Sequence, residues 1–523
     1  MLRRREFLQA GLAGAGALAF GPAFWRDALA AAPATPGVGP FGPLQAPDAN
    51  GIMLPNGFSS RVIARGLQPV PGTAYPWHIF SDGQATFAQP DGGWILVSNC
   101  EAPPDAGGGA EAIRFRADGS TAGAHRILGG TQNNCAGGPT PWGTWLSCEE
   151  HDGGRVWECD PTGAQPARVH PAMGVFSHEA AAVDPAGRRV YLTEDDGSGG
   201  FYRFTPDAYP DLSRGLLEIA SVQASGAVRW LPVPDPSASS GPTRSQVPGY
   251  TPFRRGEGIW FDSGVVYVAT TSDERIHAYD TVGETIEVIY DAKTLSNPPL
   301  QEVDNITVAR SGDLFVCEDA GDLSMGVITP DRVVADFLRL TGAQHGDPNT
   351  AAASELTGVT FNPSGDRMYF SSQRAFGVGV IYEITGPFRP ARPPVSGPST
   401  PLGFLVTVDP DIPIPRVLGL GTPMAVRVAE PAELLIILRS TVARRVRLPG
   451  RLPRYGVRRV PITISAARFS VPAGSTGIDL RPGVYARRLL PGRRPVWTST
   501  LAVTATYANG RSDSDTRTVR LIR

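Results

Sequence analysis

The 523-residue chain contains a single lysine, Lys293, although it carries 48 basic residues in all. Nearly every positive charge is therefore a guanidinium, and a side chain that clamps a phosphate or carboxylate here has to be an arginine. Cysteine is also scarce: there are five, and no two form the Cys-x-x-Cys pair typical of a zinc site. An odd number of thiols leaves at least one cysteine outside any disulfide.

Long amphipathic helical windows are hard to find in this sequence. The 61 glycines and 50 prolines together exceed a fifth of the residues and follow no strict period. This composition excludes a mainly helical protein and indicates a turn-rich, all-β protein. The length predicts two domains preceded by a leader.

The formal net charge of −2 hides an uneven distribution. From Pro401 onward there are 20 arginines and 7 acidic residues, which leaves 28 basic and 43 acidic residues before that point. The acidic body is suited to binding cations. Two interpretations of the basic part stay open: a domain that binds an anionic envelope polymer, or a solvated appendage. We expect no nucleic-acid partner.

The N-terminus resembles a twin-arginine export signal. Arg3, Arg4 and Arg5 are followed by Phe7, and a short apolar stretch rich in alanine and glycine runs from Ala10 to Phe20. This stretch is too short to span a membrane. We therefore expect a signal peptide over residues 1–32 and a secreted or cell-envelope (periplasmic) protein without a membrane span.

A hairpin unit recurs between Ile52 and Pro387. In each unit a Gly- or Pro-containing turn leads into an apolar run that ends on polar residues: Trp94–Glu101, Trp142–Glu150, Val190–Asp196, Val265–Thr270, Leu314–Asp319 and Met368–Gln373. The spacing of roughly 45–75 residues is that of propeller blades. We predict a six-bladed β-propeller over residues 33–388, with an insertion loop within residues 205–255; a β-sandwich stays open as the alternative.

Acidic side chains begin the first strand or end the second strand of these units. A hairpin returns the chain, so both positions lie at one edge of the sheet. We expect the following carboxylates to meet at one mouth of the propeller: Asp82, Glu101, Glu149, Glu150, Glu179, Asp195, Glu257, Asp304 and Glu355. Carboxylates at such close range repel unless cations or protons neutralise them, which predicts a centre of several cations. Cys148 would add a soft ligand.

The run NCAGGPTPWGTWLSCEE, residues 134–150, is the most specific motif in the chain. Four shorter motifs accompany it: Ser177–Ala180, Gly256–Gly258, Val303–Asn305 and Glu355–Gly358. Together, from about Pro55 to Gly386, they resemble the PhoX-type alkaline phosphatase family. The resemblance implies a Tat-exported phosphomonoesterase with two ferric ions and several calcium ions at the propeller mouth.

The resemblance also implies roles for individual residues. Cys148 would be the thiolate that bridges the iron pair, and Glu179 a further iron ligand. The other carboxylates would share the remaining iron and calcium positions: Glu149, Glu150, Glu257, Asp304 and Glu355. The sequence departs from the family pattern at Cys100, where histidine is expected, and at Arg374, where a His-Pro-Gly continuation is expected.

Bound polyvalent cations neutralise a phosphomonoester dianion, stabilise its leaving oxygen and activate an oxygen nucleophile. Arginine binds phosphate oxygens bidentately, and the candidates are Arg254, Arg255 and Arg374. We therefore predict a phosphoric monoester hydrolase, most active at alkaline pH, that acts on small phosphomonoesters. Two alternatives stay open: a calcium-dependent lactonase-like hydrolase, and a non-catalytic calcium-binding propeller attached to the cell envelope.

A Pro-rich linker over residues 389–400 ends the predicted propeller. Beyond it, alternating runs predict strands at Glu433–Arg447, Val460–Val471 and Trp497–Tyr507, and Asn509-Gly510 predicts a closing hairpin. We expect a small Ig-like β-sandwich over residues 401–523.

Overall fold

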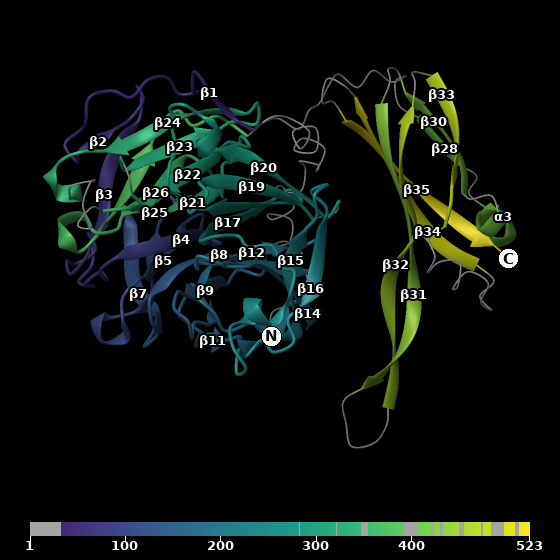
Figure 1. Ribbon diagram of the computed structural model, residues 1–523, viewed down its shortest axis with the longest axis horizontal. Coiled ribbons are helices and arrows are strands. Elements are labelled where there is room, and N and C mark those ends of the chain that lie inside the picture. The colour runs from purple at the N-terminus through teal and green to yellow at the C-terminus, as the bar shows by residue number, and fades with distance from the viewer. Residues whose placement is uncertain are drawn as a thin grey trace. The chain divides into compact units, whose positions relative to one another are not determined.

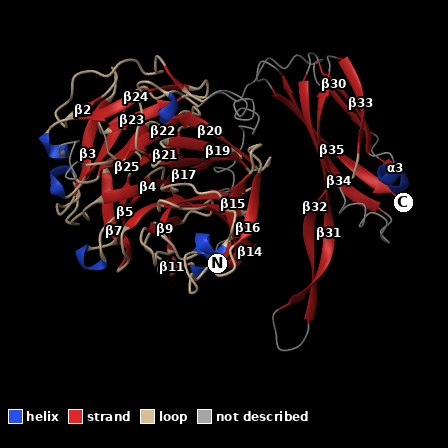
Figure 2. Cartoon of the chain, in the orientation of Figure 1, coloured by secondary structure: helices blue, strands red, loops and turns tan. Residues whose placement is uncertain are grey.

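The computed structural model describes residues 33–281, 283–320, 322–346, 354–391, 405–408, 411–419, 422–428, 432–448, 454–471, 474–482, 496–507 and 512–522. The predicted signal peptide lies outside these residues, as does most of the predicted linker. The chain divides into two compact units, Met1–Arg392 and Pro393–Arg523. Strands dominate both units (Figure 2), which confirms the all-β prediction.

Helical segments are short throughout the described residues. They are the 3-10 turns η2 (Pro104–Ala106), η3 (Pro171–Met173), η4 (Thr243–Gln246), η5 (Ala292–Thr294), η6 (Ala343–His345) and η7 (Ala375–Gly377), and the helix α3 (Ile414–Gly419). No helix among the described residues is long and apolar enough to cross a membrane.

Six sheets follow one another along the described part of the first unit (Figure 1). The first contains β4 (Ser81–Ala88), β5 (Trp94–Cys100), β6 (Gly109–Phe115) and β7 (Thr121–Gly129). The second contains β8 (Asn134–Pro139), β9 (Trp145–Glu149), β10 (Val156–Cys159) and β11 (Arg168–Val169). The third contains β12 (His178–Asp184), β13 (Arg189–Glu194), β14 (Phe201–Ala208), β15 (Asp211–Val222) and β16 (Val228–Pro232).

The other three sheets repeat this antiparallel order. The fourth contains β17 (Gly256–Asp262), β18 (Val265–Thr270), β19 (Arg275–Asp280) and β20 (Thr285–Asp291). The fifth contains β21 (Val303–Val308), β22 (Leu314–Glu318), β23 (Ser324–Ile328) and β24 (Val333–Leu340), extended by β1 (Thr35–Pro36) and β2 (Ile52–Met53). The sixth contains β25 (Leu356–Phe361), β26 (Arg367–Ser372), β27 (Val380–Thr385) and β3 (Ser59–Arg65).

The first strands of the six sheets form a closed, propeller-like ring. The strands β4, β8, β12, β17, β21 and β25 each pack on the next, and β25 packs on β4. The N-terminal strand β3 pairs with β27, with Arg65 opposite Val380, so the sixth sheet joins the two ends of this part of the chain. The first and second strands of each sheet are antiparallel, as predicted, so the start of one and the end of the other share an edge.

Apolar side chains fill the space between neighbouring sheets. Leu146, Val190, Leu192 and Tyr202, for example, share one cluster between the second and third sheets. The strands β9 and β13 are buried over nearly their whole length, because neighbouring sheets cover both of their faces. Part of the predicted insertion loop is regular structure, because residues 205–232 form part of β14 and all of β15 and β16. Residues 233–255 contain no strand and include η4.

The second unit contains two sheets in its described residues. One joins β28 (Leu405–Val408), β30 (Thr422–Val428) and β33 (Gly474–Leu480). The other joins β29 (Asp411–Pro413), β35 (Ser512–Ile522), β34 (Val496–Tyr507), β31 (Ala432–Leu448) and β32 (Arg454–Val471). Val426, Ile478, Ile436 and Leu501 belong to one cluster, so both sheets share a core. The predicted strands are confirmed here, and β34 pairs with β35 as expected.

Candidate metal centre

Each of the six first strands carries a β-bulge near its start. The register shifts between Ser81 and Gln84, Asn134 and Gly137, His178 and Ala181, Gly256 and Ile259, Val303 and Ile306, and Thr357 and Thr360. A bulge inserts an extra residue and redirects its side chain. The bulged segments supply Asp82, Cys135, Glu179, Glu257 and Asp304, while the sixth bulge contains Gly358.

In two of the bulges, the ligand side chain is followed by a glycine that lies close to the backbone of the next sheet. A Cβ on Gly83 would lie 2.4 Å from Cα of Ala136 on the next sheet. A Cβ on Gly258 would lie 2.7 Å from Cα of Asn305. The Asp82-Gly83 and Glu257-Gly258 pairs thus combine a ligand side chain with the close strand approach that brings the ligands together.

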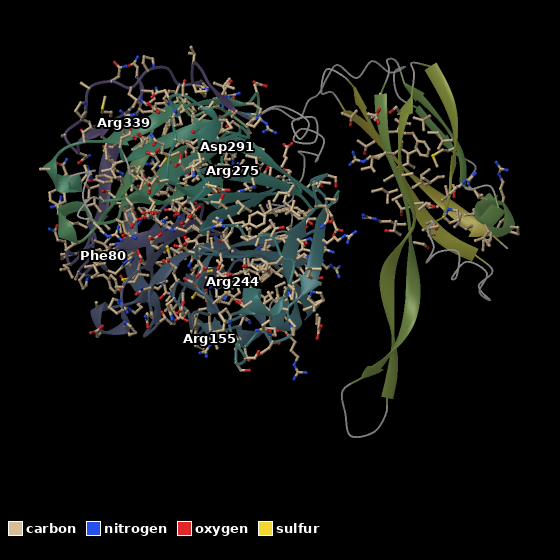
Figure 3. The ribbon with its side chains drawn as sticks, in the orientation of Figure 1. Phe80, Arg155, Arg244, Arg275, Asp291 and Arg339 are labelled. Atoms are coloured by element: carbon tan, nitrogen blue, oxygen red, sulfur yellow. The ribbon has the colours of Figure 1, made fainter. Side chains whose placement is uncertain are left out.

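A second set of side chains follows the end of each second strand. The backbone amide of each such residue donates to the carbonyl of the residue directly before the first strand of the same sheet. The six pairs are Glu101 to Phe80 (labelled in Figure 3), Glu150 to Asn133, Asp195 to Ser177, Thr271 to Arg255, Asp319 to Glu302 and Gln373 to Glu355. These six hydrogen bonds measure 2.8–3.1 Å. They fix one side chain per sheet at the edge where the bulges lie.

We call the side chains that gather at this edge the acidic ring. Its members are Asp82, Glu101, Cys135, Glu150, Glu179, Asp195, Glu257, Asp304, Asp319 and Glu355. Three groups within it hold ligand atoms that all lie within 4.8 Å of one another: Asp82, Glu101 and Cys135; Cys135, Glu150 and Glu179; and Glu179, Glu257 and Asp304. Cys135 and Glu179 each belong to two groups, so the three groups form one continuous chain.

Several ring carboxylates are buried without enough hydrogen-bond donors. Asp82 and Glu179 are each 1 % exposed. Oδ1 of Asp82 and Oε2 of Glu179 are buried and accept no hydrogen bond. The thiol of Cys135 donates to Oε1 of Glu179 at 3.3 Å. A buried carboxylate oxygen without a hydrogen-bond donor is costly unless a cation binds it, so these oxygens are suited to holding a cation.

Burial and like charge raise the pKa of the ring carboxylates. Burial, with the charge of Glu101 next in importance, raises the pKa of Asp82 to about 7. The same two causes, together with Asp195, raise the pKa of Glu150 to about 9. Burial followed by neighbouring carboxylates also raises the pKa of Glu179, Glu257 and Asp304 well above the usual range. Bound cations would replace the protons that these groups otherwise retain.

Two arginines contact the ring. Arg255 donates to Asp195 at 3.0 Å, and its guanidinium lies 2.9 Å from Glu257 and 3.4 Å from Asp319. Arg374 pairs with Glu355 and lies 3.9 Å from Glu101. The third predicted arginine, Arg254, is exposed and donates to the carbonyl of Gly197 at 3.4 Å. The structure thus brings Arg255 and Arg374 to the ring but not Arg254.

The structure does not place Cys148 in the ring. Its side chain is fully buried in the cluster that contains Leu146, Val156 and Met173. Burial raises the pKa of this thiol far above its usual range, so it stays a neutral apolar group. The thiol that the structure brings to the ring carboxylates is that of Cys135, on the neighbouring strand.

Glu149 also lies outside the three groups. Its Oε1 accepts from the amide of Gln132 at 3.0 Å, and its Oε2 accepts from the amide of Arg155 at 3.2 Å and from Trp157 at 3.0 Å. Glu194 and Glu318 occupy the equivalent position, where Glu194 pairs with Arg244 (labelled in Figure 3) and Glu318 accepts from backbone amides. A glutamate at this position secures loops, and the structure does not place Glu149 in the acidic ring.

Cys135 and Asp319 belong to the ring although the sequence did not predict them as site residues. The signal for Cys135 was its place in the opening dipeptide Asn134-Cys135, in register with Asp82 and Glu179. Asp319 follows Glu318 as Asp195 follows Glu194. Cys100 and Cys317 are fully buried and belong to none of the three groups.

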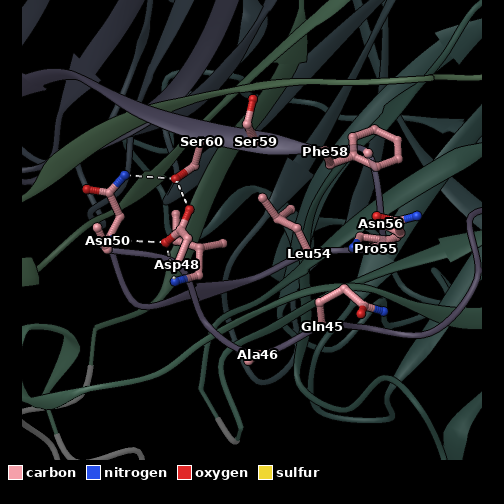
Figure 4. A pocket seen from close by; sticks show the side chains of 13 residues that line it. Gln45, Ala46, Asp48, Asn50, Leu54, Pro55, Asn56, Phe58, Ser59 and Ser60 are labelled. Atoms are coloured by element: carbon pink, nitrogen blue, oxygen red, sulfur yellow. Dashed lines mark hydrogen bonds between the residues drawn. The ribbon is translucent and has the colours of Figure 1, made fainter.

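A separate surface pocket of about 310 Å³ lies over residues 45–60 (Figure 4). Asp48 lines it and accepts from the amides of Asn50 at 2.8 Å and Ile52 at 3.0 Å. Its other carboxylate oxygen accepts from the hydroxyl of Ser60. The pocket shares no residue with the acidic ring, and its carboxylate is already satisfied.

The fold and the ring define a class: a propeller-like β protein with a carboxylate and thiol centre at the mouth. The model of the alkaline phosphatase PhoX family matches residues 102–155, 151–289 and 281–375, which together span just over half of the chain. The chain belongs to this family. No curated protein matches it.

Two solved structures are similar to the chain at low identity. A gluconolactonase from Xanthomonas campestris is 14 % identical, with 67 % of this chain and 99 % of that chain covered at a TM-score of 0.37. A calcium-binding protein, regucalcin, from Agrobacterium tumefaciens is 15 % identical, with 64 % and 97 % covered at a TM-score of 0.37. At such TM-scores neither neighbour bears on the function of this chain.

Proposed function

We propose that the chain is an exported, metal-dependent phosphomonoesterase whose metal ions bind the acidic ring. The observation that carries the proposal is the continuous chain of three ligand groups, in which buried carboxylate oxygens have no donor. Membership of the alkaline phosphatase PhoX family supports the reaction type.

The donor set fits iron and calcium. Carboxylate oxygens suit calcium, and a thiolate together with carboxylates suits ferric iron. Cys135 and Glu179 each belong to two groups, so each could be a ligand in either group. We propose two ferric ions near Cys135 and Glu179, with calcium held by the remaining carboxylates, Asp82, Glu101, Glu150, Glu257 and Asp304.

Bound metal ions would supply charge neutralisation for the phosphate and a lowered pKa for an oxygen nucleophile. Arg255 is the guanidinium best placed to bind phosphate oxygens. One of its partners, Glu257, belongs to a cation group, so cation binding competes with Arg255 for that carboxylate. Loss of Glu257 would free one N–H of Nη2, while Nε and Nη2 keep their hydrogen bonds to Asp195. The freed N–H could then donate to a phosphate oxygen.

Several finer structural assignments belong to the same proposal. The closed order of the first strands supports a six-bladed propeller, and the shared core of the second unit supports an Ig-like sandwich. We propose export through the twin-arginine route to the periplasm or cell envelope. The arginine-rich second unit would bind an anionic envelope polymer through its charge.

Activity assays with matched variants test the proposed reaction. Metal-loaded wild type should hydrolyse a chromogenic phosphomonoester, lose that activity with a chelator, and leave a lactone intact. Asp304→Asn removes a ring charge and should lower kcat/KM by at least about 100-fold. Asp118→Asn, in an exposed turn at the other end of the first sheet, is the matched control and should retain activity.

Two results of these assays would contradict the proposed phosphomonoesterase activity. Chelator-sensitive lactone hydrolysis without phosphatase activity would favour the lactonase-like alternative. Tight calcium binding without turnover of either substrate would favour a binding protein.

A further inference from the structure

The sixth sheet contributes different chemistry to the ring from the other sheets. After the second strand, the first, second, third and fifth sheets place a carboxylate: Glu101, Glu150, Asp195 and Asp319. The fourth sheet places Thr271, whose hydroxyl donates to Glu257 at 2.9 Å. The sixth sheet places Gln373 and then Arg374, an amide followed by a fixed positive charge.

Both side chains pair with carboxylates of the first and sixth sheets. Gln373 is fully buried, and its Nε2 donates to Asp82 and, at 2.6 Å, to Glu101. The guanidinium of Arg374 pairs with Glu355, which is 7 % exposed, and reaches Glu101 at 3.9 Å. Arg374 therefore stands between two carboxylates from neighbouring sheets, which is where a cation would bridge them.

The position of Arg374 differs from that of Arg255 in one respect. Glu257, a partner of Arg255, belongs to one of the three ligand groups of the ring. Glu355, the main partner of Arg374, belongs to none of them. Cation binding would compete for Glu257 but would leave the Arg374–Glu355 pair intact. Arg374 is therefore the cation that pairs with Glu355 in the described structure, and a buried carboxylate needs such a positive partner.

We propose that Arg374 is a built-in counter-ion that takes the place of a divalent cation between Glu355 and Glu101. This inference rests on the proposed metal centre and limits it: the chain itself neutralises Glu355, while Glu101 stays a ligand in the group that it forms with Asp82 and Cys135. Arg374 is then a positioning residue for the ring, and Arg255 carries the phosphate contact.

Metal content tests this role through three variants. After dialysis against millimolar calcium, Arg374→Gln should bind one more calcium ion per chain than wild type, measured by elemental mass spectrometry. Arg374→Lys keeps the positive charge and should bind no additional ion. Arg254→Gln makes the same chemical change at an exposed arginine outside the ring and should also match wild type.

Thermal unfolding supplies a second readout. The melting temperature of Arg374→Gln should fall below that of wild type without calcium and recover when calcium is added, whereas Arg254→Gln should show neither effect. An unchanged metal content in Arg374→Gln, or a failure to fold even in calcium while Arg374→Lys folds, overturns the inference. A rise in KM without a change in metal content would make Arg374 a phosphate ligand instead.

The two proposals fail in different ways. Wild type that binds no metal would contradict the proposed metal centre. Wild type that binds metal, with an Arg374→Gln variant that binds no more, would contradict only the role of Arg374.

Discussion

Cys135 and Cys148 lie on adjacent strands of one sheet, in opposite surroundings. Cys148 packs among apolar side chains, whereas Cys135 donates to Glu179 and lies near Asp82, Glu150 and Glu101. Burial and these negative charges raise the pKa of the Cys135 thiol well above its usual range. A thiolate at Cys135 therefore requires a cation that replaces its proton.

Glu158, which is not a member of the acidic ring, allows a test of how one carboxyl contributes to stability. Burial alone would raise its pKa, but hydrogen bonds from His170, Trp142 and Thr144 outweigh burial and lower the pKa from 4.5 to about 2. A carboxyl with a lowered folded-state pKa stabilises the fold above its unfolded pKa and loses that contribution as the pH falls through the folded value.

The expected contribution of Glu158 is on the order of 1–2 kcal/mol, because screening at a partly exposed pair reduces the full linkage value. Thermal unfolding of wild type and Glu158→Gln should therefore differ at pH 4.5 and converge near pH 2, the window set by the two pKa values. A gap that stays constant across this range would contradict the lowered pKa.

The hairpin is the element that organises the ring. Its existence was predictable, because apolar runs bounded by Gly and Pro turns mark strands, and antiparallel pairing puts Asp82 and Glu101 at one edge. The bulge was not predictable, because it depends on how neighbouring strands pack. Strict alternation alone cannot distinguish Cys135 from Cys148. The sequence pattern favoured Cys148, whereas the structure brings Cys135 to the ring.

Gly83 tests whether close strand approach assembles the ring. A methyl group there would meet the backbone of Ala136, which can yield only by moving a strand. Gly83→Ala should lower the free energy of unfolding by about 1–3 kcal/mol and weaken metal retention. Denaturant titration and metal analysis measure both effects.

Gly123→Ala is the matched control. Nothing lies within 4 Å of a Cβ at Gly123. It should leave stability and metal content close to wild type. Equal effects of the two substitutions would show that the approach at Gly83 is not required.

Closure of the whole ring joins residues that are distant in sequence. The pairing of β3 with β27 and the packing of β25 on β4 bring Asp82 next to Gln373. Composition and repeats predicted an all-β protein with acidic strand ends. The individual partners, such as Arg374 with Glu355 or Arg255 with Asp195, depend on this closure and could not be read from local patterns.

Removal of metal should make the stability of the whole molecule pH-dependent. A carboxyl with a raised folded-state pKa contributes stability below its unfolded pKa and loses it as the pH rises through the folded value. Asp82 and Glu150, with pKa values of about 7 and about 9, set the window for the metal-free protein. The melting temperature of chelated protein should fall as the pH rises from about 4.5 to about 9.

Metal-loaded protein should show a much smaller change over the same range, because cations replace the protons of the ring. The same reasoning supports tighter cation binding, and hence higher activity, at alkaline pH. Identical pH profiles with and without chelator would contradict a cation-filled ring.

The most direct measurement is elemental analysis combined with the visible spectrum of protein purified after export, compared among wild type, Cys135→Ser and Cys148→Ser. We predict about two iron ions per chain and several calcium ions, by the fit of the donor set to these ions. A thiolate-to-ferric absorption band should be present in wild type and Cys148→Ser and absent in Cys135→Ser. Colourless protein that contains calcium alone, or a band that survives in Cys135→Ser, would contradict an iron centre bound through Cys135.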